Sequence, residues 1–503
     1  MSIARILLYP LFIFLGMIIG IYIAKSIQPP TKENKADKLD QIINTIDNNY
    51  VKDLDKSEIE NRAINAMLME LDPHSSYITK EQNPAFTENM KGSFSGIGIE
   101  FKIIDDTITV LSVIEKGPCS KIGVKTGDRI LSVNGKKVAN IKITNEEVVK
   151  LLKGEKNSEV KIEVKRNEIK ENIAFQIIRN TVPIKSVESA LMMNDNIGYV
   201  KISRFSEKTY EEVIDKFSIL LAKGMTKLIL DLRDNPGGYM HIATLICDEF
   251  LKEGHLIVYT KDRHDNEDKT YATKKGLVEK TKLAVIINEQ SASASEIIAG
   301  AIQDNDRGII IGRRSYGKGL VQKPFPLNDG SIIKLTTHKY YTPSGRCIQK
   351  DYQNSKTEYF LEHEIDTIKY LTKKGNIVYG GGGITPSVIV NRETNVNYQQ
   401  INYANAKGWI TDFCFKYAEQ NKHIDYKHFS ELNKIDLYND FFSYVSKQEN
   451  EFVFNLGKKE SKYLQSLILA TVSRYLFNID SYYEIINNQD EFVKAAVLEL
   501  AKE

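Results

Sequence analysis

The amino-acid sequence predicts a multidomain α/β protein, and three observations lead to this fold class. The chain has 503 residues, more than one hydrophobic core usually organises. Between residues 197 and 390, apolar strand-like runs alternate with helical segments, as in α/β domains with a largely parallel sheet. The preceding part consists of short β-rich runs, and after residue 391 apolar residues recur at helical spacing.

These patterns divide the chain into five regions. An apolar N-terminal segment and a short polar linker precede a helical region. A small β-rich domain, an α/β core and a helical C-terminal extension follow. We place the five regions at residues 6–24, 36–90, 91–170, 180–390 and 391–503.

The N-terminal segment, residues 6–24, is apolar and carries no charge. At about 1.5 Å per residue, a helix of this length can just cross a bilayer core of about 30 Å. A cleaved signal peptide is the alternative, but the apolar run is long and no A-x-A-like cleavage site is evident. Flanking lysines and Arg5 do not decide the orientation. We expect a single-pass anchor with a short inside tail and an exported body.

The next two regions differ in their periodicity. Residues 39–71 have apolar residues at helical spacing, whereas residues 91–170 contain short runs with β-forming residues. Asn134 and Gly135 form a strong hairpin signal within the β-rich part. We expect a helical region followed by a small independent β domain.

Composition excludes several classes of protein. The chain is 42% hydrophobic and 27% charged, which is typical of globular proteins. A formal net charge of +2 gives no basic field for nucleic acid, so no nucleic-acid partner is expected. The four cysteines are scattered, without a C-x-x-C pair or a His/Cys cluster, so neither a zinc site nor a disulfide framework is indicated. We expect no metal and no cofactor.

One segment, G-R-R-S-Y-G-K-G at residues 312–319, is close to the phosphate-binding loop G-x-x-x-x-G-K-[ST]. Gly319 stands where that motif needs a hydroxyl for magnesium. The residues that follow are β-like and include two prolines, whereas a phosphate loop must open a helix. A P-loop nucleotidase is therefore the weakest of the functional interpretations.

Lys318 in this segment has another use, as a general base. Its reference pKa of about 10.4 would have to fall to roughly 7–8 through burial. Glycines and apolar residues surround it, and in an extended chain Gln322 would lie on the same face and could orient it. Taken alone, the segment is better explained by a solvated surface lysine than by a general base.

Two further segments lie at strand ends, where α/β sheets build their sites. Residues 288–297, N-E-Q-S-A-S-A-S-E-I, follow a buried strand and open a helix, whose N–H groups could face an oxyanion. Residues 231–238, D-L-R-D-N-P-G-G, end another strand, and their glycines allow a close approach of the backbone to a ligand. Each also fits ordinary packing or a simple turn.

Together, these three segments resemble the carboxyl-terminal processing peptidases, which are membrane-associated or exported serine proteases with a Ser–Lys pair. The resemblance extends over residues 39–390 and includes L-D-P-H-S-S-Y at 71–77 and Y-Y-T-P-S-G-R at 340–346. It implies a PDZ-like domain and a ClpP/crotonase-like protease core. It also implies a protein of the bacterial inner membrane with its protease domain outside the cytoplasm.

The resemblance assigns roles to five residues. It implies that Ser293 is the nucleophile, Lys318 its general base and Gln322 the residue that orients the lysine. The backbone N–H groups of Gly238 and Ala294 would form the oxyanion hole. The choice of Ser293 over its two neighbouring serines rests on the resemblance alone. The implied reaction passes through an acyl-enzyme.

The resemblance also implies a site for carboxyl-terminal tails in the β-rich domain. The loop of Ser95, Gly96, Ile97 and Gly98 would bind the terminal carboxylate, and a strand beginning at Ile97 would pair with the tail. Ile97 and Ile99 would shape a pocket for an apolar last residue.

The expected function is a serine endopeptidase that recognises protein substrates by their apolar tails. A non-enzymatic PDZ scaffold on a decayed protease core is the main alternative. The presence of both Ser293 and Lys318 favours the enzyme. Assembly into a homo-oligomer is left open.

Overall fold

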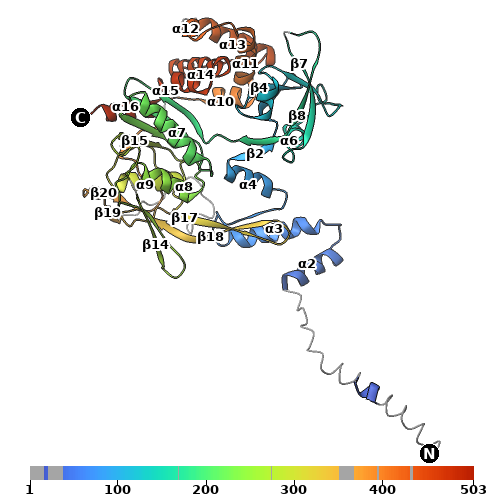
Figure 1. Ribbon diagram of the computed structural model, residues 1–503, viewed down its shortest axis with the longest axis vertical. Helices are drawn as coiled ribbons and strands as arrows, with labels where there is room; N and C mark the ends of the chain where they lie inside the picture. The colour runs from blue at the N-terminus through green and yellow to red at the C-terminus, as the bar shows by residue number, and fades with distance from the viewer. Residues whose placement is uncertain are drawn as a thin grey trace, which may run out of the picture. The chain divides into compact units, whose positions relative to one another are not determined.

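The computed structural model describes residues 16–20, 38–167, 169–273, 275–350, 368–392, 396–430 and 434–502. The chain divides into two compact units, Met1–Tyr77 and Ile78–Glu503. The first unit contains the helices α2 (Lys38–Asn49) and α3 (Lys56–Met69) (Figure 1). Asp55 caps α3 by accepting hydrogen bonds from the backbone N–H groups of Ser57 and Glu58.

The predicted membrane span, residues 6–24, lies outside the described residues except for residues 16–20, which are helical. Across the described ranges, no helix combines the length and the apolar character needed to cross a bilayer. The membrane anchor therefore stays a prediction.

The β-rich domain is built on a sheet with strand order β3-β4-β5-β7-β8. These strands are β3 (Ile99–Ile104), β4 (Thr107–Val113), β5 (Arg129–Val133), β7 (Glu159–Lys165) and β8 (Ile173–Ile178), with β6 (Lys136–Lys137) paired to β5. Asn134 and Gly135, both at positive φ, form the β5–β6 hairpin, which confirms the predicted turn.

Two helices complete this domain, α5 (Pro118–Ile122) and α6 (Asn145–Leu152). A capping box between Thr144 and Glu147 starts α6. The domain is joined to the rest of the second unit through β2 (Ser93–Gly96), which follows α4 (Asn83–Lys91) and pairs with β9 (Asn180–Pro183).

The α/β core is a six-stranded sheet with order β10-β11-β12-β15-β16-β21. Only β10 runs antiparallel to its neighbour, so the sheet is largely parallel, as predicted. The strands are β10 (Val187–Met192), β11 (Ile197–Ile202), β12 (Lys227–Asp231), β15 (Lys282–Ile287), β16 (Ile309–Gly312) and β21 (Val388–Ile389).

Helices cover both faces of this sheet. On one face pack α7 (Thr209–Ala222), α8 (Met240–Asp248) and α9 (Ala294–Asp304). On the other face lies α16 (Glu491–Ala501), whose Val493, Ala496 and Leu500 contact the alternate residues of the same strands. Side chains on successive residues of a strand point to opposite faces, which explains the near-continuous apolar runs of these strands.

A second sheet and a small hairpin lie beside the core. The sheet pairs β17 (Leu320–Pro326) with β18 (Ile332–Tyr341), β18 with β13 (Leu256–Lys261), and β13 with β14 (Glu267–Tyr271). The hairpin consists of β19 (Lys369–Leu371) and β20 (Ile377–Tyr379). Because β17 follows the 312–319 segment as a strand, the helix that a phosphate loop requires is not formed there.

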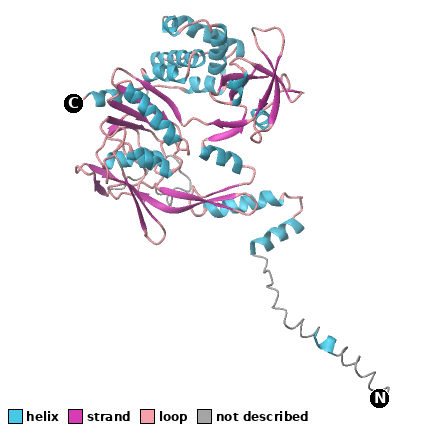
Figure 2. Ribbon diagram, in the orientation of Figure 1, coloured by secondary structure: helices cyan, strands magenta, loops and turns pink. Residues whose placement is uncertain are grey.

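The C-terminal extension is helical, as predicted. Its first five helices are α10 (Gln399–Ala406), α11 (Trp409–Gln420), α12 (Tyr426–Ser430), α13 (Lys434–Gln448) and α14 (Lys458–Leu476). These helices share an aromatic-rich core. Figure 2 shows them as a group of helices next to the β-rich domain. We call these five helices the C-terminal bundle. The chain then continues through α15 (Ile479–Asn487) to α16.

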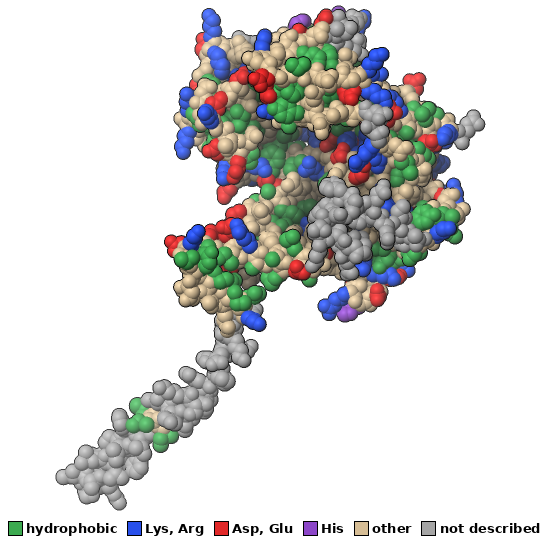
Figure 3. All heavy atoms as spheres, turned by 180° about the vertical axis from the view of Figure 1, so that it is seen from behind, with side chains coloured by type: hydrophobic (Ala, Val, Ile, Leu, Met, Phe, Trp, Pro, Cys, Tyr) green, Lys and Arg blue, Asp and Glu red, His purple; other side chains and the backbone are tan. Residues whose placement is uncertain are grey.

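The surface carries charges of both signs. On the face drawn in Figure 3, Lys and Arg side chains are interspersed with Asp and Glu side chains. This distribution agrees with the small net charge of the chain.

Candidate active site

The three predicted segments meet at one edge of the core sheet. Each follows a parallel strand: residues 232–238 follow β12, residues 288–293 follow β15 and residues 313–319 follow β16. These strands are direct neighbours, so their carboxyl ends lie side by side. The parallel sheet therefore brings together segments that are far apart in the sequence.

Ser293 differs from the two serines that flank it. Ser291 and Ser295 are fully buried, and their hydroxyl groups donate to the carbonyls of Leu232 (2.8 Å) and Asn235 (2.9 Å). Ser293 is partly exposed and stands directly before α9 with φ 55° and ψ −112°. Such a backbone conformation is strained for a non-glycine residue and is concentrated at functional sites.

The glycine loop after β12 runs directly beside Ser293. A Cβ atom on Gly237 would lie 2.8 Å from Ser293 Cβ and 3.1 Å from the backbone nitrogen of Ala294. A Cβ atom on Gly238 would lie 2.1 Å from the carbonyl oxygen of Phe205. Neither position can hold a side chain without a shift of the backbone, so this loop requires its two glycines.

Asn235 holds the glycine loop in place. Its buried side chain donates to the carbonyl of Ile202 (2.9 Å) and accepts from the N–H of Gly237 (2.9 Å). Its own carbonyl accepts from the N–H of Ala292 (3.0 Å), in the turn that carries Ser293. One buried amide residue thus joins the loop after β12 to the turn after β15.

Lys318 lies in the loop between β16 and β17 and is partly exposed. The N–H of Tyr316 in this loop donates to the carbonyl of Ser291 (3.0 Å). A Cβ atom on Gly317 would lie 2.9 Å from the carbonyl carbon of Gly382, so the four-glycine run at residues 380–383 packs closely against the lysine loop.

Glu296, in the first turn of α9, connects the serine turn to the lysine loop. Its side chain is fully buried. Its Oε2 accepts from the N–H groups of Ser293 (2.8 Å) and Lys318 (2.9 Å). Its Oε1 accepts from the N–H of Gly317 (2.7 Å) and from Ser315 Oγ (2.5 Å). The backbones that carry the predicted nucleophile and the predicted base therefore meet at a single carboxyl oxygen.

Two opposing effects act on the pKa of Glu296. Burial raises this pKa to about 7, while hydrogen bonds from Ser315, Lys318, Gly317 and Ser293 favour the ionised form. Sequence reasoning gave Glu296 no role. The signal was present as S-x-x-E at residues 293–296, which is the pattern of a helix capping box.

Tyr340 and Gln322 come from the second sheet. The hydroxyl of Tyr340 donates to the carbonyl of Ser293 (3.2 Å), and burial raises the pKa of this tyrosine. The amide of Gln322 donates to Thr336 Oγ1 on β18 (3.1 Å). A register shift between Val321 and Gln322 interrupts the regular alternation from which we inferred that Gln322 faces Lys318. That contact stays a prediction.

A charged cluster supports the loop after β12 from behind. Arg233 forms ion pairs with Asp231 (2.6 Å) and with Asp490 at the start of α16 (2.7 Å). The hydroxyl of Tyr199 also donates to Asp231 (2.7 Å). Burial alone would raise the pKa of Asp231, but Arg233 and Lys201 hold it well below its usual range.

The five residues predicted to bind carboxyl-terminal tails lie at the start of the β-rich domain. Ser95 and Gly96 belong to β2, and the expected strand starts at Ile99 instead of Ile97. The physical reason is Gly98, whose φ of +80° interrupts the extended chain. The carbonyls of Ile97 and Gly98 accept hydrogen bonds from the N–H groups of Cys119 and Ile114, respectively.

Two features of this loop bear on peptide binding. Among the described strands, β3 pairs only with β4, so it forms an edge of its sheet. Ser95 Oγ is buried and has no hydrogen-bond partner within the described residues. A buried hydroxyl without a partner is uncommon in native structures.

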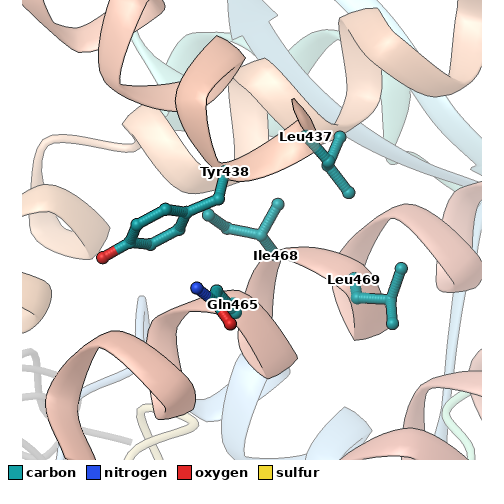
Figure 4. Close-up of a pocket in the computed structure, with 5 residues that line it drawn as sticks. All are labelled: Leu437, Tyr438, Gln465, Ile468 and Leu469. Carbon is teal, nitrogen blue, oxygen red and sulfur yellow. The ribbon is translucent and has the colours of Figure 1, made fainter. Parts of the chain in front are cut away.

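A small pocket lies within the C-terminal bundle, apart from the candidate site. The small pocket between α13 and α14 is lined by Leu437, Tyr438, Gln465, Ile468 and Leu469 and includes none of the predicted site residues (Figure 4). Within the described residues, no group of three or more His, Cys, Asp or Glu side chains is arranged to hold a metal ion.

Comparison with known proteins shows which family the chain belongs to. Residues 196–355 match the family model of peptidase family S41, residues 95–177 match that of the PDZ domain, and residues 23–82 match that of the activating protease CtpB N-terminal domain. Carboxy-terminal processing protease CtpA of Bacillus subtilis is 36% identical over 321 residues, which cover 64% of this chain and 68% of the relative. The chain belongs to peptidase family S41. The predicted resemblance to carboxyl-terminal processing peptidases is thereby confirmed, and this S41 protein is a serine peptidase with a PDZ domain.

Two more relatives and one solved structure describe how far the similarity of this S41 peptidase extends. The carboxy-terminal-processing protease of Bartonella bacilliformis is 36% identical over 337 residues, covering 65% of this chain and 76% of the relative. A probable CtpA-like serine protease of Staphylococcus aureus is 29% identical over 450 residues, covering 87% and 85%. The photosystem II D1 C-terminal processing protease is similar with 24% identity and a TM-score of 0.37, covering 70% of this chain and 91% of that one.

Proposed function

We propose that this S41 peptidase cleaves peptide bonds with Ser293 as the nucleophile and Lys318 as the general base. One observation carries the proposal: the N–H groups of both residues donate to the same oxygen of Glu296, at 2.8 and 2.9 Å. Ser293 is also the one serine of its turn that is partly exposed, since Ser291 and Ser295 are buried and bonded to backbone carbonyls.

The proposed reaction is acyl transfer. Neutral Lys318 accepts the proton of Ser293 Oγ as this oxygen attacks the peptide carbonyl, and the protonated lysine then gives its proton to the leaving amine. Water, activated by the same lysine, hydrolyses the acyl-enzyme. We propose that Gln322 orients the lysine, a role that its place on β17 close after Lys318 supports.

The proposed oxyanion hole consists of the N–H groups of Gly238 and Ala294. Two features support it. Ala294 opens α9, where N–H groups have no partner within the helix, and a Cβ atom on Gly237 would lie only 3.1 Å from its nitrogen. Two hydrogen bonds link the glycine loop to Phe205, and they use the carbonyl of Gly237 and the N–H of Tyr239. The N–H of Gly238 takes no part in this pairing. Such donors stabilise the developing negative charge.

We propose that the PDZ domain binds the apolar carboxyl-terminal tails of protein substrates. The tail would add to the open edge of β3 as an extra strand, with its carboxylate at the loop of Ser95 to Gly98. The buried Ser95 hydroxyl supports a polar ligand at this point. Ile97 and Ile99, both buried in the PDZ core, supply apolar surface for the last residue.

The test is cleavage of an unfolded protein with an apolar carboxyl terminus. Ser293→Ala and Lys318→Ala should each reduce kcat by at least about 10³-fold, as removal of a nucleophile or its base does. Lys323→Ala, at an exposed position of β17, is the matched control and should cleave normally. Undiminished cleavage by either active-site variant would refute the Ser–Lys pair. Equal cleavage of a substrate with a charged tail would refute tail recognition.

The alternative functions have less support. A non-enzymatic PDZ scaffold is not favoured, because the chain belongs to a peptidase family and keeps both Ser293 and Lys318. A nucleotidase is disfavoured because the segment after Lys318 is a strand.

We also propose that residues 6–24 anchor the protein in a bacterial inner membrane, with the peptidase outside the cytoplasm. The apolar, uncharged sequence of this segment supports the anchor. Alkaline extraction of membranes would test it: a protein released in full by this treatment is not anchored through the segment.

A further inference from the structure

The buried carboxylate of Glu296 is the structural link between two catalytic segments. It accepts one hydrogen bond from the turn that carries Ser293 and three from the loop that carries Lys318. Three of these four donors are backbone N–H groups, so the carboxylate fixes the path of the chain itself. This arrangement is independent of the side-chain rotamers of Ser293 and Lys318.

Two other contacts join the lysine loop to the serine turn: the N–H of Tyr316 donates to the carbonyl of Ser291 (3.0 Å), and Arg313 pairs with Glu289 (3.6 Å). Neither of them holds the backbone of Ser293 or Lys318, as the carboxylate of Glu296 does. The loop is rich in glycine, and the lysine side chain has four flexible carbons. Loss of the carboxylate would remove the common acceptor of the N–H groups of Ser293, Gly317 and Lys318, which is unfavourable enough to separate the segments. Displacement of reacting groups by about 1 Å can reduce a rate about 10²-fold.

We propose that Glu296 is a positioning residue that sets the distance between Ser293 and Lys318. This inference rests on the Ser–Lys mechanism proposed above and deepens it. The carboxylate acts through the two backbones and does not touch the peptide substrate.

The ionised form of Glu296 is the one that fits this role. All four partners donate hydrogen bonds to the carboxyl group. A protonated carboxyl group would add a fifth hydrogen, which needs an acceptor that these donors do not offer. Ser315 Oγ, the nearest alternative acceptor, already accepts from the N–H of Ile384 (2.6 Å). The charged and titratable groups of the surrounding segments are Arg313, Arg314 and Lys318 from the loop, Glu289 from the serine turn and Tyr340 from β18. Activity should therefore depend on the charge of Glu296 as well as on that of Lys318.

The principal variant is Glu296→Gln, which keeps the size of the side chain but replaces one acceptor oxygen by an NH₂ group. We expect kcat to fall about 10²-fold with little change in KM, because peptide binding on the PDZ domain is untouched. Glu211→Gln is the matched control: Glu211 is exposed on α7, pairs with Lys208, lies outside the three segments of the candidate site and should leave kcat unchanged. Circular dichroism and peptide binding report whether each variant is folded.

Ser315→Ala provides a second, milder test should Glu296→Gln fail to fold. It removes one of the four donors, and we expect kcat to fall about 10-fold at constant KM. A pH profile adds a readout that a merely structural role would not change. The wild-type rate should rise through two ionisations, and Glu296→Gln should lose one of them.

The outcomes separate this inference from the proposed mechanism. Wild-type kcat in folded Glu296→Gln, or an unchanged pH profile, would overturn the positioning role even if Ser293→Ala and Lys318→Ala are inactive. Activity in Ser293→Ala would instead overturn the mechanism itself. A reduced kcat that is restored by neither higher pH nor higher substrate concentration supports the positioning role.

Discussion

At the scale of single residues, burial separates the proposed nucleophile from the groups that support it. Ser291, Ser293 and Ser295 lie close together where the turn after β15 enters α9, and the first and last of them donate their hydroxyl groups to backbone carbonyls. Ser293 is left partly exposed at a strained backbone position next to the glycine loop. The carboxylate of the neighbouring Glu296 could also accept a proton. Its burial and its four hydrogen-bond donors instead favour a role in holding the chain in place.

The raised pKa of Glu296 predicts a pH dependence of stability. This pKa is about 7 in the folded protein, against 4.5 for the unfolded group. The folded state thus binds more protons between these values, so this carboxyl makes the protein less stable as pH rises from 4.5 to 7. Compared with Glu296→Gln, the wild type should lose up to about 3 kcal/mol over this window.

Urea unfolding of both proteins at several pH values measures this difference. The Gln variant is the control for all other titrating groups, since only position 296 differs. A difference that stays constant, or grows in favour of the wild type with rising pH, would contradict the prediction. The expected result implies that the ionised, positioning form of Glu296 is maintained at a cost in stability.

At the scale of secondary-structure elements, the last helix supports two loops of the candidate active site. Helix α16 covers the face of the core sheet opposite α7, α8 and α9. The ring of Phe492, at its start, lies between the guanidinium groups of Arg233 (4.8 Å) and Arg313 (4.9 Å). These arginines belong to the loops after β12 and β16, so one helix contacts two of the three catalytic segments from behind.

Asp490 has two roles at this helix, and two substitutions separate them. It caps α16 by accepting from the N–H groups of Phe492 and Val493, and it pairs with Arg233 (2.7 Å). Asp490→Asn keeps a good cap but removes the charge, whereas Asp490→Ala removes both. We expect Asp490→Ala to be less stable than Asp490→Asn by about 1 kcal/mol.

Thermal unfolding and kcat, measured on both variants, check this prediction. A fall in kcat in both variants would show that the ion pair with Arg233 affects the glycine loop after β12. Equal melting temperatures of the Asn and Ala variants would contradict the capping role.

At the scale of the whole molecule, the C-terminal bundle and the PDZ domain share an interface that is rich in ion pairs. The pairs are Lys102–Asp412, Arg129–Glu419, Lys416–Asp105 and Arg474–Glu100, with N–O distances of 2.6–3.0 Å. A small apolar cluster of Ile104, Leu111, Phe415 and Tyr475 accompanies them. Glu100, Lys102 and Ile104 alternate on β3, so the bundle contacts one face of the strand that is proposed to receive the peptide.

The Arg129–Glu419 pair is the most buried of the four, and its reversal tests the interface. Arg129→Glu places two carboxylates together and should loosen the PDZ domain from the bundle. The double variant Arg129→Glu/Glu419→Arg should restore the contact. Each exposed pair contributes at most about 1 kcal/mol and is screened by salt, so raised ionic strength should loosen the wild type as well.

Small-angle scattering and limited proteolysis at low and high salt measure this change. The single variant should show a larger radius of gyration at low salt, and the double variant should match the wild type. Identical scattering curves for all three proteins would mean that these charges do not hold the interface.

Much of this protein could be predicted from its sequence alone. The periodicity of apolar residues predicted the largely parallel sheet and the helical C-terminal region, since strands buried on both faces read as continuous apolar runs. The resemblance carried by the three glycine- and serine-rich segments predicted the peptidase family. Strand ends in a parallel sheet share one edge, so even the meeting of these segments followed from local patterns.

Contacts between residues that are distant in the sequence depended on the tertiary structure. No local pattern joins Glu296 to the loop of Lys318, Asp490 to Arg233, or the C-terminal bundle to the PDZ domain. The start of β3 at Ile99 was likewise set by the backbone at Gly98, which adopts a positive φ in its packed surroundings. A sequence determines which residues can form an element, because periodicity is local. Which donor meets which acceptor is decided only when packing brings the elements together.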